Sequence, residues 1–297
     1  MKDTCIVFDS SADCKNQEFD DVFVLPTTII SNKNGKVTTY KDGVDITIEE
    51  VEKNENEGHF YSTAAVNPSL ALELFTKLSK DYKMVYVFPI PGTISPGGVN
   101  SLNLAASEFD NVIIVEQSMV SLMSRWEILD LLELKKNNLL DLPHIKEVVN
   151  YYAQNIAAAL VTRDLSFLIN GGRIKKVTGM IAKLLNIIPI NSFDREGVTQ
   201  RLKVMKIDKI PNAIEKYFST FLNDFKWENV ERVGLLSSKL QSPKFKIKEI
   251  ENLIKNTFAK KLPKGIVFET GGLPAVIACH TGPNYIAFLV LMKKEKI

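Results

Sequence analysis

Short apolar runs of strand length alternate with helical patterns over the first half of the chain, and this alternation restricts the possible folds more than any other feature. Apolar runs of this length, bounded by turn residues, are typical of buried strands. They cover residues 5–8, 22–30, 84–90 and 112–115. Helical patterns cover residues 70–78, 102–109 and 119–134. The alternation predicts an α/β fold with a mostly parallel, doubly wound sheet, in which Pro26 makes the second strand irregular or an edge strand.

The second half of the chain mixes hairpin and crossover signals, and a turn is expected at residues 194–197. Strands are expected at residues 158–162, 187–190, 202–205, 233–237, 265–269, 275–279 and 286–292. Helices are expected at residues 174–185, 211–225 and 245–258. We therefore predict two domains: an N-terminal α/β domain over residues 1–155 and a C-terminal domain with a mixed α/β sheet over residues 156–297.

Composition narrows the class of protein. The 297 residues carry 37 basic and 35 acidic side chains, a net charge of +2 without the clustered basic excess that nucleic-acid binding needs. No apolar run reaches the roughly 18 residues of a membrane-spanning helix, so any lipid must be enclosed and membrane contact only transient. The cysteines, Cys5, Cys14 and Cys279, lack the spacing of metal ligands. We expect a cytoplasmic protein.

A Gly/Pro-rich loop over residues 89–101 (PIPGTISPGGVNS) follows a predicted strand and precedes a predicted helix. Ligands of open α/β sheets bind at the carboxyl ends of strands, and a helix N-terminus favours an anion. The loop supplies hydroxyls at Thr93 and Ser95 and backbone freedom at Gly97 and Gly98. A turn without any ligand accounts for the same residues equally well, and no nucleotide-binding motif is present.

Three further segments carry candidate side chains. Thr63 lies in YSTAAVNPS, where hydroxyls cap helices more often than they bind a carboxylate. Arg173 follows a Gly-Gly turn that can direct its guanidinium at a carboxylate or phosphate, and a surface salt bridge is the alternative. His280 lies in CHTGPN at an expected strand end. A lone histidine is usually structural, and without neighbouring ligands a metal site is not expected.

Taken in order, these segments resemble those of the DegV family, the bacterial fatty-acid-binding proteins that serve fatty acid kinase. LSFLINGGRI at residues 165–174 is similar to the family's LEYLKKGGRI, and HTGPN at 280–284 to its H-x-GPG. The resemblance extends along nearly the whole chain. Further matches are FDSSAD at 8–13 with TDSTADL, YKDGVDI at 40–46 with Y-x-DG-x-DI, Thr63 and Pro68 with the ends of TSQPSP, and LNIIPI at 185–190 with LLNIKPI.

The chain departs from the family pattern in places. The family's SSGLSGTYQSA corresponds to residues 91–102 with one extra residue, so either Ser95 or Pro96 occupies the position of the SGT serine. Ala64 and Ala65 replace the serine-glutamine of TSQPSP, and Met205 stands where an arginine is usual. These changes put in doubt whether the end of the molecule that would face a phosphate or a partner is the same as in the family.

The resemblance implies a carrier and not an enzyme, with a long-chain fatty acid as ligand and no cofactor. The acyl tail would lie in a tunnel mainly within the N-terminal domain, where Ala64, Ala65, Ala105 and Ala106 either leave room for it or only pack helices. The carboxyl group would lie at the domain interface. A separate fatty acid kinase would supply ATP and magnesium.

The resemblance also implies residue roles. Thr63 and Ser95 would donate hydrogen bonds to the carboxyl group, with Thr93 and the backbone of Gly97 or Gly98 nearby. His280 would lie at the same mouth and Arg173 would face the transferred phosphate. Two alternatives stay open: a stand-alone hydrolase or phosphotransferase with Ser95 or Cys279 as nucleophile, although no G-x-S-x-G motif is present, and a lipid-storage protein or scaffold without kinase coupling.

Overall fold

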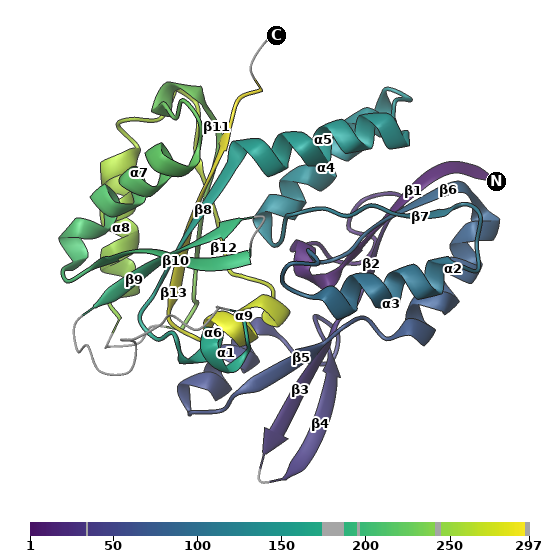
Figure 1. The fold of residues 1–297 in the computed structure, drawn as a ribbon, viewed down its shortest axis with the longest axis horizontal. Coiled ribbons are helices and arrows are strands. Elements are labelled where there is room, and N and C mark those ends of the chain that lie inside the picture. The colour runs from purple at the N-terminus through teal and green to yellow at the C-terminus, as the bar shows by residue number, and fades with distance from the viewer. Residues whose placement is uncertain (34, 174–186, 195–196, 241–244, 295–297) are drawn as a thin grey trace.

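The computed structural model describes residues 1–33, 35–173, 187–194, 197–240 and 245–294. In these residues the chain forms three sheets with helices packed against them (Figure 1). The first sheet has the strand order β2-β1-β6-β7, and its paired strands are parallel. Its strands are β1 (Lys2–Asp9), β2 (Val22–Leu25), β6 (Tyr82–Phe88) and β7 (Val112–Ile114). A short 3-10 helix, η1 (Ser10–Ala12), follows β1.

Helices cover both faces of the first sheet. They are α2 (Pro68–Asp81), α3 (Pro96–Ala106), α4 (Leu122–Lys136) and α5 (Leu142–Asn155). Because successive side chains of a strand point to opposite faces, Cys5 and Val7 pack with Phe75 of α2 in one core, while Ile6 and Phe8 pack in another core with residues of α4 and α5. The doubly wound parallel sheet predicted for the first half is confirmed, although α5 itself was not foreseen.

The second sheet has the order β10-β9-β8-β13-β11-β12 and is mixed, because only β11 and β12 pair in parallel. Its strands are β8 (Ile156–Thr162), β9 (Ile188–Asp194), β10 (Gly197–Val204), β11 (Val230–Ser237), β12 (Phe268–Gly271) and β13 (Tyr285–Met292). The mixed sheet predicted for the second half is confirmed.

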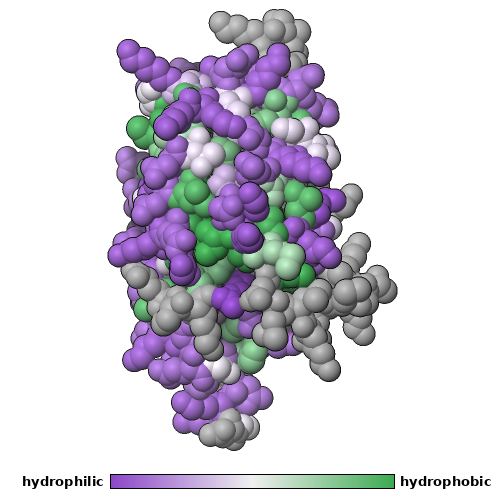
Figure 2. All heavy atoms as spheres, turned by 90° about the vertical axis from the view of Figure 1, so that its left-hand side faces the viewer, coloured by the Kyte–Doolittle hydropathy of each residue, from purple (hydrophilic) through white to green (hydrophobic). Residues whose placement is uncertain are grey.

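Helices α7 (Ile210–Phe221) and α8 (Ile247–Phe258) cover one face of the second sheet, and the 3-10 helices η2 (Ile207–Lys209) and η3 (Trp227–Asn229) flank α7. Both long helices are amphipathic: Ile214 and Phe218 of α7 and Ile250 and Ile254 of α8 are fully buried in the core. Figure 2 shows this side of the molecule, where hydrophilic side chains border a central apolar area. The inner face of the sheet is covered by α4 and α5, together with α6 (Ser166–Asn170) and α9 (Ala275–Thr281).

A third, antiparallel sheet of order β4-β3-β5 extends from the lower end of the molecule in Figure 1. Its elements are β3 (Thr28–Lys33), β4 (Lys36–Lys41) and β5 (Tyr61–Ala64), with α1 (Ile48–Asn56) between β4 and β5. The apolar run at residues 22–30 therefore supplies strands to two different sheets. The break falls at Pro26, which has no N–H for a sheet ladder.

One predicted strand is a helix in the structure. Residues 275–279 were predicted as a strand and instead form helix α9, so that prediction is wrong. Short apolar runs do not distinguish a strand from a buried helix, and α9 is buried on nearly all sides against α1, α6 and β5. The helix predicted at residues 174–185 lies outside the described residues.

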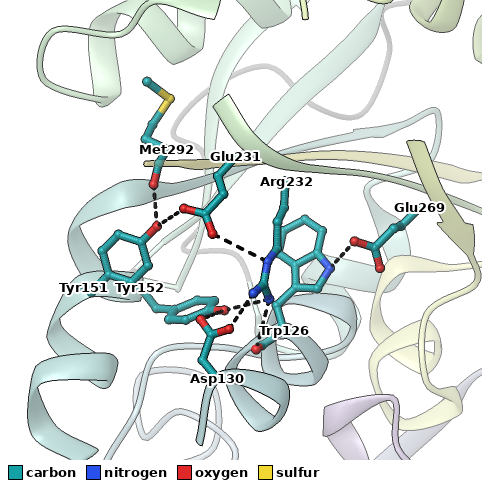
Figure 3. Close-up of polar contacts among 8 residues, drawn as sticks. All are labelled: Trp126, Asp130, Tyr151, Tyr152, Glu231, Arg232, Glu269 and Met292. Atoms are coloured by element: carbon teal, nitrogen blue, oxygen red, sulfur yellow. Dashed lines mark hydrogen bonds and ion pairs between the residues drawn. The ribbon is translucent and has the colours of Figure 1, made fainter. Parts of the chain in front are cut away.

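A polar cluster joins the helices of the first half to the strands of the second (Figure 3). The guanidinium of Arg232 on β11 donates to Asp130 Oδ1 at 2.5 Å and to the Tyr152 hydroxyl at 3.3 Å. The indole of Trp126 donates to Glu269 of β12 at 2.8 Å. Contacts thus cross the predicted boundary, and the division into domains at residues 155 and 156 stays a prediction.

Helix α1 buries a carboxyl group against α9 whose titration should be visible in stability. Glu55 is 3% exposed, and neither carboxyl oxygen has a hydrogen-bond partner among the described residues. Burial, and to a lesser extent the charge of Glu52, raise the pKa of Glu55 from 4.5 to about 9. The native state therefore holds a proton that the unfolded chain releases above pH 4.5, so native stability falls as the pH rises from about 4.5 to 9.

Replacing Glu55 by glutamine should remove this loss. We expect Glu55→Gln to unfold like the parent near pH 4.5 and to be more stable at pH 7 by about 3 kcal/mol, from roughly 1.4 kcal/mol for each pH unit. Urea unfolding at both pH values measures the difference. Glu73→Gln, at an exposed site of α2, is the control. An equal effect of Glu55→Gln at both pH values would contradict the buried proton.

Candidate functional site

The strand order of the parallel sheet reverses between β1 and β6: β2 lies on one side of β1, and β6 lies on the other side. The carboxyl ends of strands at such a point form the usual ligand crevice of open α/β sheets. Asp9, the last residue of β1, accepts hydrogen bonds there from the Ser11 N–H at 2.9 Å and from the Ile90 N–H at 2.5 Å. Burial raises the pKa of its carboxyl group. Asp9 thus ties the end of β1 to the loop that follows β6.

A small pocket with a cavity volume of about 20 Å³ lies at this crevice, and we call it the head pocket. Residues from both halves of the sequence line it. They include Asp9, Thr63, Ser95, Gly98, Arg173 and His280. β5 supplies Thr63, the loop after β6 supplies Ser95, the turn after α6 supplies Arg173, and the end of α9 supplies His280. The head pocket therefore depends on the packing of α9 between β5 and α6.

Thr63 contacts both His280 and Arg173. Thr63 Oγ1 and His280 Nε2 are 2.8 Å apart, although 217 residues separate them in the sequence. Arg173 donates to the Gly171 carbonyl at 2.8 Å and more weakly to Thr63 Oγ1 at 3.5 Å. The Arg173 side chain is half-buried and makes no ion pair with a carboxylate in the part of the chain that the structure describes. A surface salt bridge, the alternative weighed for Arg173, is not found there.

His280 is a neutral group near pH 7. It is 8% exposed, and burial together with the neighbouring charge of Arg173 lowers its pKa from 6.5 to about 3. Its Nδ1 atom is buried without a hydrogen-bond partner among the described residues. A bare acceptor nitrogen is easier to leave unpaired than an N–H, so we assign the proton to Nε2. The Thr63 hydroxyl then accepts from His280 and keeps its own hydrogen for a ligand.

The lack of a side chain at Gly171 leaves the space that the His280 imidazole occupies. A Cβ atom at position 171 would lie 2.1 Å from His280 Nδ1, so only glycine allows the ring to occupy this place. Gly282, with φ +77°, allows a similar close approach at the C-terminal end of α9, where a Cβ would lie 2.4 Å from Phe167. The Gly-Gly turn before Arg173 therefore makes room for His280 in addition to directing the guanidinium.

The loop after β6 brings only some of its candidate residues to the head pocket. Ser95 lines it, and its hydroxyl makes no hydrogen bond to the described residues, although Ser95 stands at the N-cap position of α3. Gly98 also lines the head pocket, and its N–H donates a hydrogen bond to the Ser95 carbonyl at 2.9 Å. Thr93 and Gly97 are exposed and line neither this pocket nor the one described next.

A second, apolar pocket adjoins the head pocket. Its cavity volume is about 60 Å³, below the size range of small-molecule sites, so a long ligand enters only when the lining side chains move apart. Aliphatic side chains of β8, β11 and β13 line it. The two pockets share Ile94, Arg173, Ile277 and His280. They are therefore adjacent, with hydroxyl, imidazole and guanidinium groups around the head pocket and hydrocarbon around most of the apolar pocket.

The apolar pocket does not lie where the sequence suggested a tunnel. Most of its lining residues follow residue 155, and four precede it: Ile94, Val120, Ser121 and Met123. The space arises where Ala158 of β8 and Ala287 of β13 face the interior, because their methyl groups reach less far than the leucines beside them. Ala105 and Ala106, considered earlier as lining a tunnel, instead pack in the core between the first sheet and its helices. Sequence reasoning missed the strand alanines because they occur in an otherwise ordinary apolar run.

The nucleophiles considered for a stand-alone enzyme are poorly placed for that role. Cys279 is 2% exposed, and burial raises the pKa of its thiol well above the usual value, which disfavours the reactive thiolate. Ser95 has no hydrogen-bonded base among the described residues. No group of three or more potential metal ligands occurs in the ranges that the structure describes. In the same ranges no helix is both long enough and apolar enough to cross a membrane.

The fold and these two pockets define a class: α/β proteins with a parallel and a mixed sheet, and an internal site that is polar at one end and apolar along its body. A family model described as "Uncharacterised protein, DegV family" matches residues 3–293. The chain belongs to the DegV family, and the resemblance noted in its sequence is confirmed. A DegV domain-containing protein of Mycoplasma pneumoniae is 28% identical over 307 residues, covering 99% of each chain.

Solved structures share the fold. A DegV family protein from Thermus thermophilus, described by its fatty acid binding, has a TM-score of 0.79 at 24% identity and covers 98% of this chain and 100% of its own. DegV from Bacillus subtilis, described as a fatty acid binding protein, has a TM-score of 0.77 at 20% identity, covering 99% and 100%. A stearic acid-binding protein from Eubacterium ventriosum has a TM-score of 0.77 at 20% identity, covering 99% of each chain.

Proposed function

We propose that this protein binds one long-chain fatty acid, with the carboxyl group in the head pocket and the acyl tail in the apolar pocket. The observation that carries the proposal is that the two pockets lie side by side and share Ile94, Arg173, Ile277 and His280. An elongated site with polar groups at one end only matches a molecule with the same distribution of polarity. The related structures from Thermus thermophilus, Bacillus subtilis and Eubacterium ventriosum, described as binding fatty acids, support it.

The energetics suit such a ligand. Burial of each methylene contributes about 0.8 kcal/mol, so about 15 methylenes contribute roughly 12 kcal/mol before the costs of association and of moving lining side chains apart. The carboxylate needs hydrogen-bond donors when it leaves water. We assign Thr63 and Ser95 as those donors, with the half-buried Arg173 supplying positive charge.

The first test is to identify what the protein carries. Protein purified natively is denatured, extracted and examined by mass spectrometry, and one long-chain fatty acid per chain is the expected result. A lipid-free protein that also fails to take up added oleate or palmitate would contradict the proposal.

Removing the Thr63 hydroxyl should weaken fatty-acid binding. A hydrogen bond to a charged group contributes about 1.5–3 kcal/mol, so we expect Thr63→Val to raise the Kd for palmitate by roughly 10- to 100-fold. Competition with a fluorescent fatty acid measures the change. Thr39→Val, at an exposed site of β4, is the matched control and should bind like the parent. Unchanged affinity in Thr63→Val would remove Thr63 from the site.

We further propose that the protein is a carrier that presents the carboxyl group to a partner fatty acid kinase in the cytoplasm, with no cofactor of its own. Arg173 supports this, because a guanidinium that lines the head pocket suits a phosphoryl group as well as a carboxylate. The test is to mix the protein, a fatty acid kinase, ATP with magnesium, and palmitate, and to measure acyl phosphate. Formation of acyl phosphate only when the protein is present supports the carrier role. Its absence under all conditions would leave lipid storage.

A further inference from the structure

Leu273 stands between the apolar pocket and a larger, open groove. The groove has a cavity volume of about 700 Å³, within the size range of small-molecule sites, and we call it the outer groove. Among the described residues, only Leu273 lines both the apolar pocket and the outer groove. It is 7% exposed. The wall between the two spaces is therefore one side chain thick at this point.

This thin part of the wall lies away from the head pocket. Leu273 comes shortly before α9, whereas His280, which lines the head pocket, lies near the other end of that helix. The seven residues of α9 span about 10 Å at roughly 1.5 Å per residue. An acyl chain with its carboxyl group in the head pocket would therefore meet Leu273 only with its hydrocarbon part.

The outer groove has space for hydrocarbon beside α9. Ile46 and Ala275 line it, are 5% and 4% exposed, and pack in the same apolar core cluster. The buried carboxyl group of Asp42 also lines it and accepts a hydrogen bond from the Val276 N–H at 3.4 Å. Four charged side chains nearer the solvent form two ion pairs: Arg125 with Glu18, and Lys239 with Glu49. These four charges are paired with one another, and buried apolar surface lies beside α9.

The apolar pocket offers a long chain little room elsewhere. Its cavity volume is about 60 Å³, and protein interiors are close-packed, so a side chain that moves usually meets other atoms. Leu289 is an example: it lines the apolar pocket from β13, an inner strand of the second sheet, and is 2% exposed. Leu273 has the outer groove behind it instead. Its N–H donates to the Tyr285 hydroxyl at 2.8 Å, which holds the backbone and leaves the side chain as the boundary.

We propose that Leu273 sets the upper limit of acyl chain length by closing the apolar pocket toward the outer groove. This inference rests on the proposed fatty-acid binding. A tail that ends within the apolar pocket stays covered by Leu273, whereas a longer tail has to pass the Leu273 isobutyl group to find further space. Removing that group joins the two spaces, and the end of a longer chain then lies against Ile46 and Ala275 in the outer groove.

The first test compares palmitate with tetracosanoate, a saturated acid with a longer chain, and Kd is measured by displacement of a fluorescent fatty acid. Relative to the parent, Leu273→Ala should favour tetracosanoate over palmitate by about 10- to 50-fold, the effect of burying roughly two to three more methylenes. Leu273→Val, which shortens the side chain by one carbon, should shift the preference in the same direction by less. It also keeps the test open if the alanine variant does not fold.

The second test locates the end of the chain. A long-chain acid with a photoreactive diazirine at its distal end is bound and irradiated, and mass spectrometry identifies the attachment sites. In Leu273→Ala the label should attach to residues of the outer groove, such as Ile46 and Ala275. Leu289→Ala is the matched control for both tests, because it removes the same atoms from the apolar pocket but Leu289 does not line the outer groove. Circular dichroism shows which variants are folded.

The outcomes separate this inference from the proposed function. A larger shift toward tetracosanoate in Leu273→Ala than in Leu289→Ala, together with labelling of the outer groove only in Leu273→Ala, supports the role of Leu273. An equal shift in both variants, no shift in folded Leu273 variants, or labelling of the outer groove already in the parent overturns that role and leaves fatty-acid binding in place. Failure of the parent to bind palmitate overturns the proposed function, and the role of Leu273 with it.

Discussion

Alanine at position 171 is expected to push the His280 ring away from Thr63 and to weaken fatty-acid binding on the order of 100-fold. The added methyl carbon would lie 2.1 Å from His280 Nδ1, far inside van der Waals contact. The ring is buried at the end of α9, and a displacement that relieves this clash would break its contact with Thr63. Loss of that contact frees Thr63 to rotate away from the carboxyl position and leaves a buried imidazole unpaired, and each effect costs about 1–3 kcal/mol.

Two measurements check the Gly171→Ala prediction. The NMR signals of the imidazole report the displacement of His280, and palmitate binding reports the consequence. Gly272→Ala is the matched control, since a Cβ there meets its nearest neighbour, the Tyr285 hydroxyl, at 3.5 Å, an ordinary contact. Circular dichroism shows whether both variants are folded. A folded Gly171→Ala protein with parental affinity would exclude His280 from the head pocket.

Leucine in place of Ala287 should shorten the acyl chain that the protein accepts. Ala287 faces the apolar pocket from β13, and three added carbons would occupy space that the tail needs. Exclusion of about four methylenes removes roughly 3 kcal/mol of binding free energy, which is about a 100-fold loss of affinity for stearate. Octanoate, which is too short to reach the blocked region, should lose little.

The Ala287→Leu prediction is checked with saturated acids from octanoate to stearate. In the parent, affinity should rise with each added carbon, whereas in the variant it should stop rising at a shorter length. Ala259→Leu, at an exposed site after α8, controls for added hydrophobicity. Thermal unfolding measures any strain from overpacking, which typically costs 1–3 kcal/mol. If both proteins show the same dependence on chain length, the tail lies elsewhere.

Much of the fold was predictable because its elements follow local rules. β1, β6, β8 and β13 are continuous apolar runs of strand length, and such runs become buried strands when helices cover both faces of a sheet. Helix α2 was predicted from its helical pattern, and in the structure Asn67 caps it by accepting from the Ser69 N–H at 2.9 Å. Helix α9 was predicted wrongly, because its seven residues are too short and too uniformly buried for a helical period to appear.

The candidate site was predictable only in part. Thr63, Ser95, Gly98, Arg173 and His280 were named from motifs and all line the head pocket. The motifs could be found because each includes a turn or lies next to a helix end, where glycine, proline and polar residues are unusual enough to notice. Asp9 and Ser121 were not named, since an aspartate after a strand and a serine before a helix have common structural roles that leave no distinctive signal.

The sequence by itself determined the α/β class, the two kinds of sheet, and the turn segments that carry the polar groups of the head pocket. These depend on hydrophobic period and turn chemistry, which act over a few residues. Only the tertiary structure decided that His280 meets Thr63 across 217 residues, that Gly171 admits the imidazole, and that the apolar pocket lies against β8 and β13. Such contacts depend on which faces of distant elements pack together and on where alanine leaves space between them, and no local pattern encodes either.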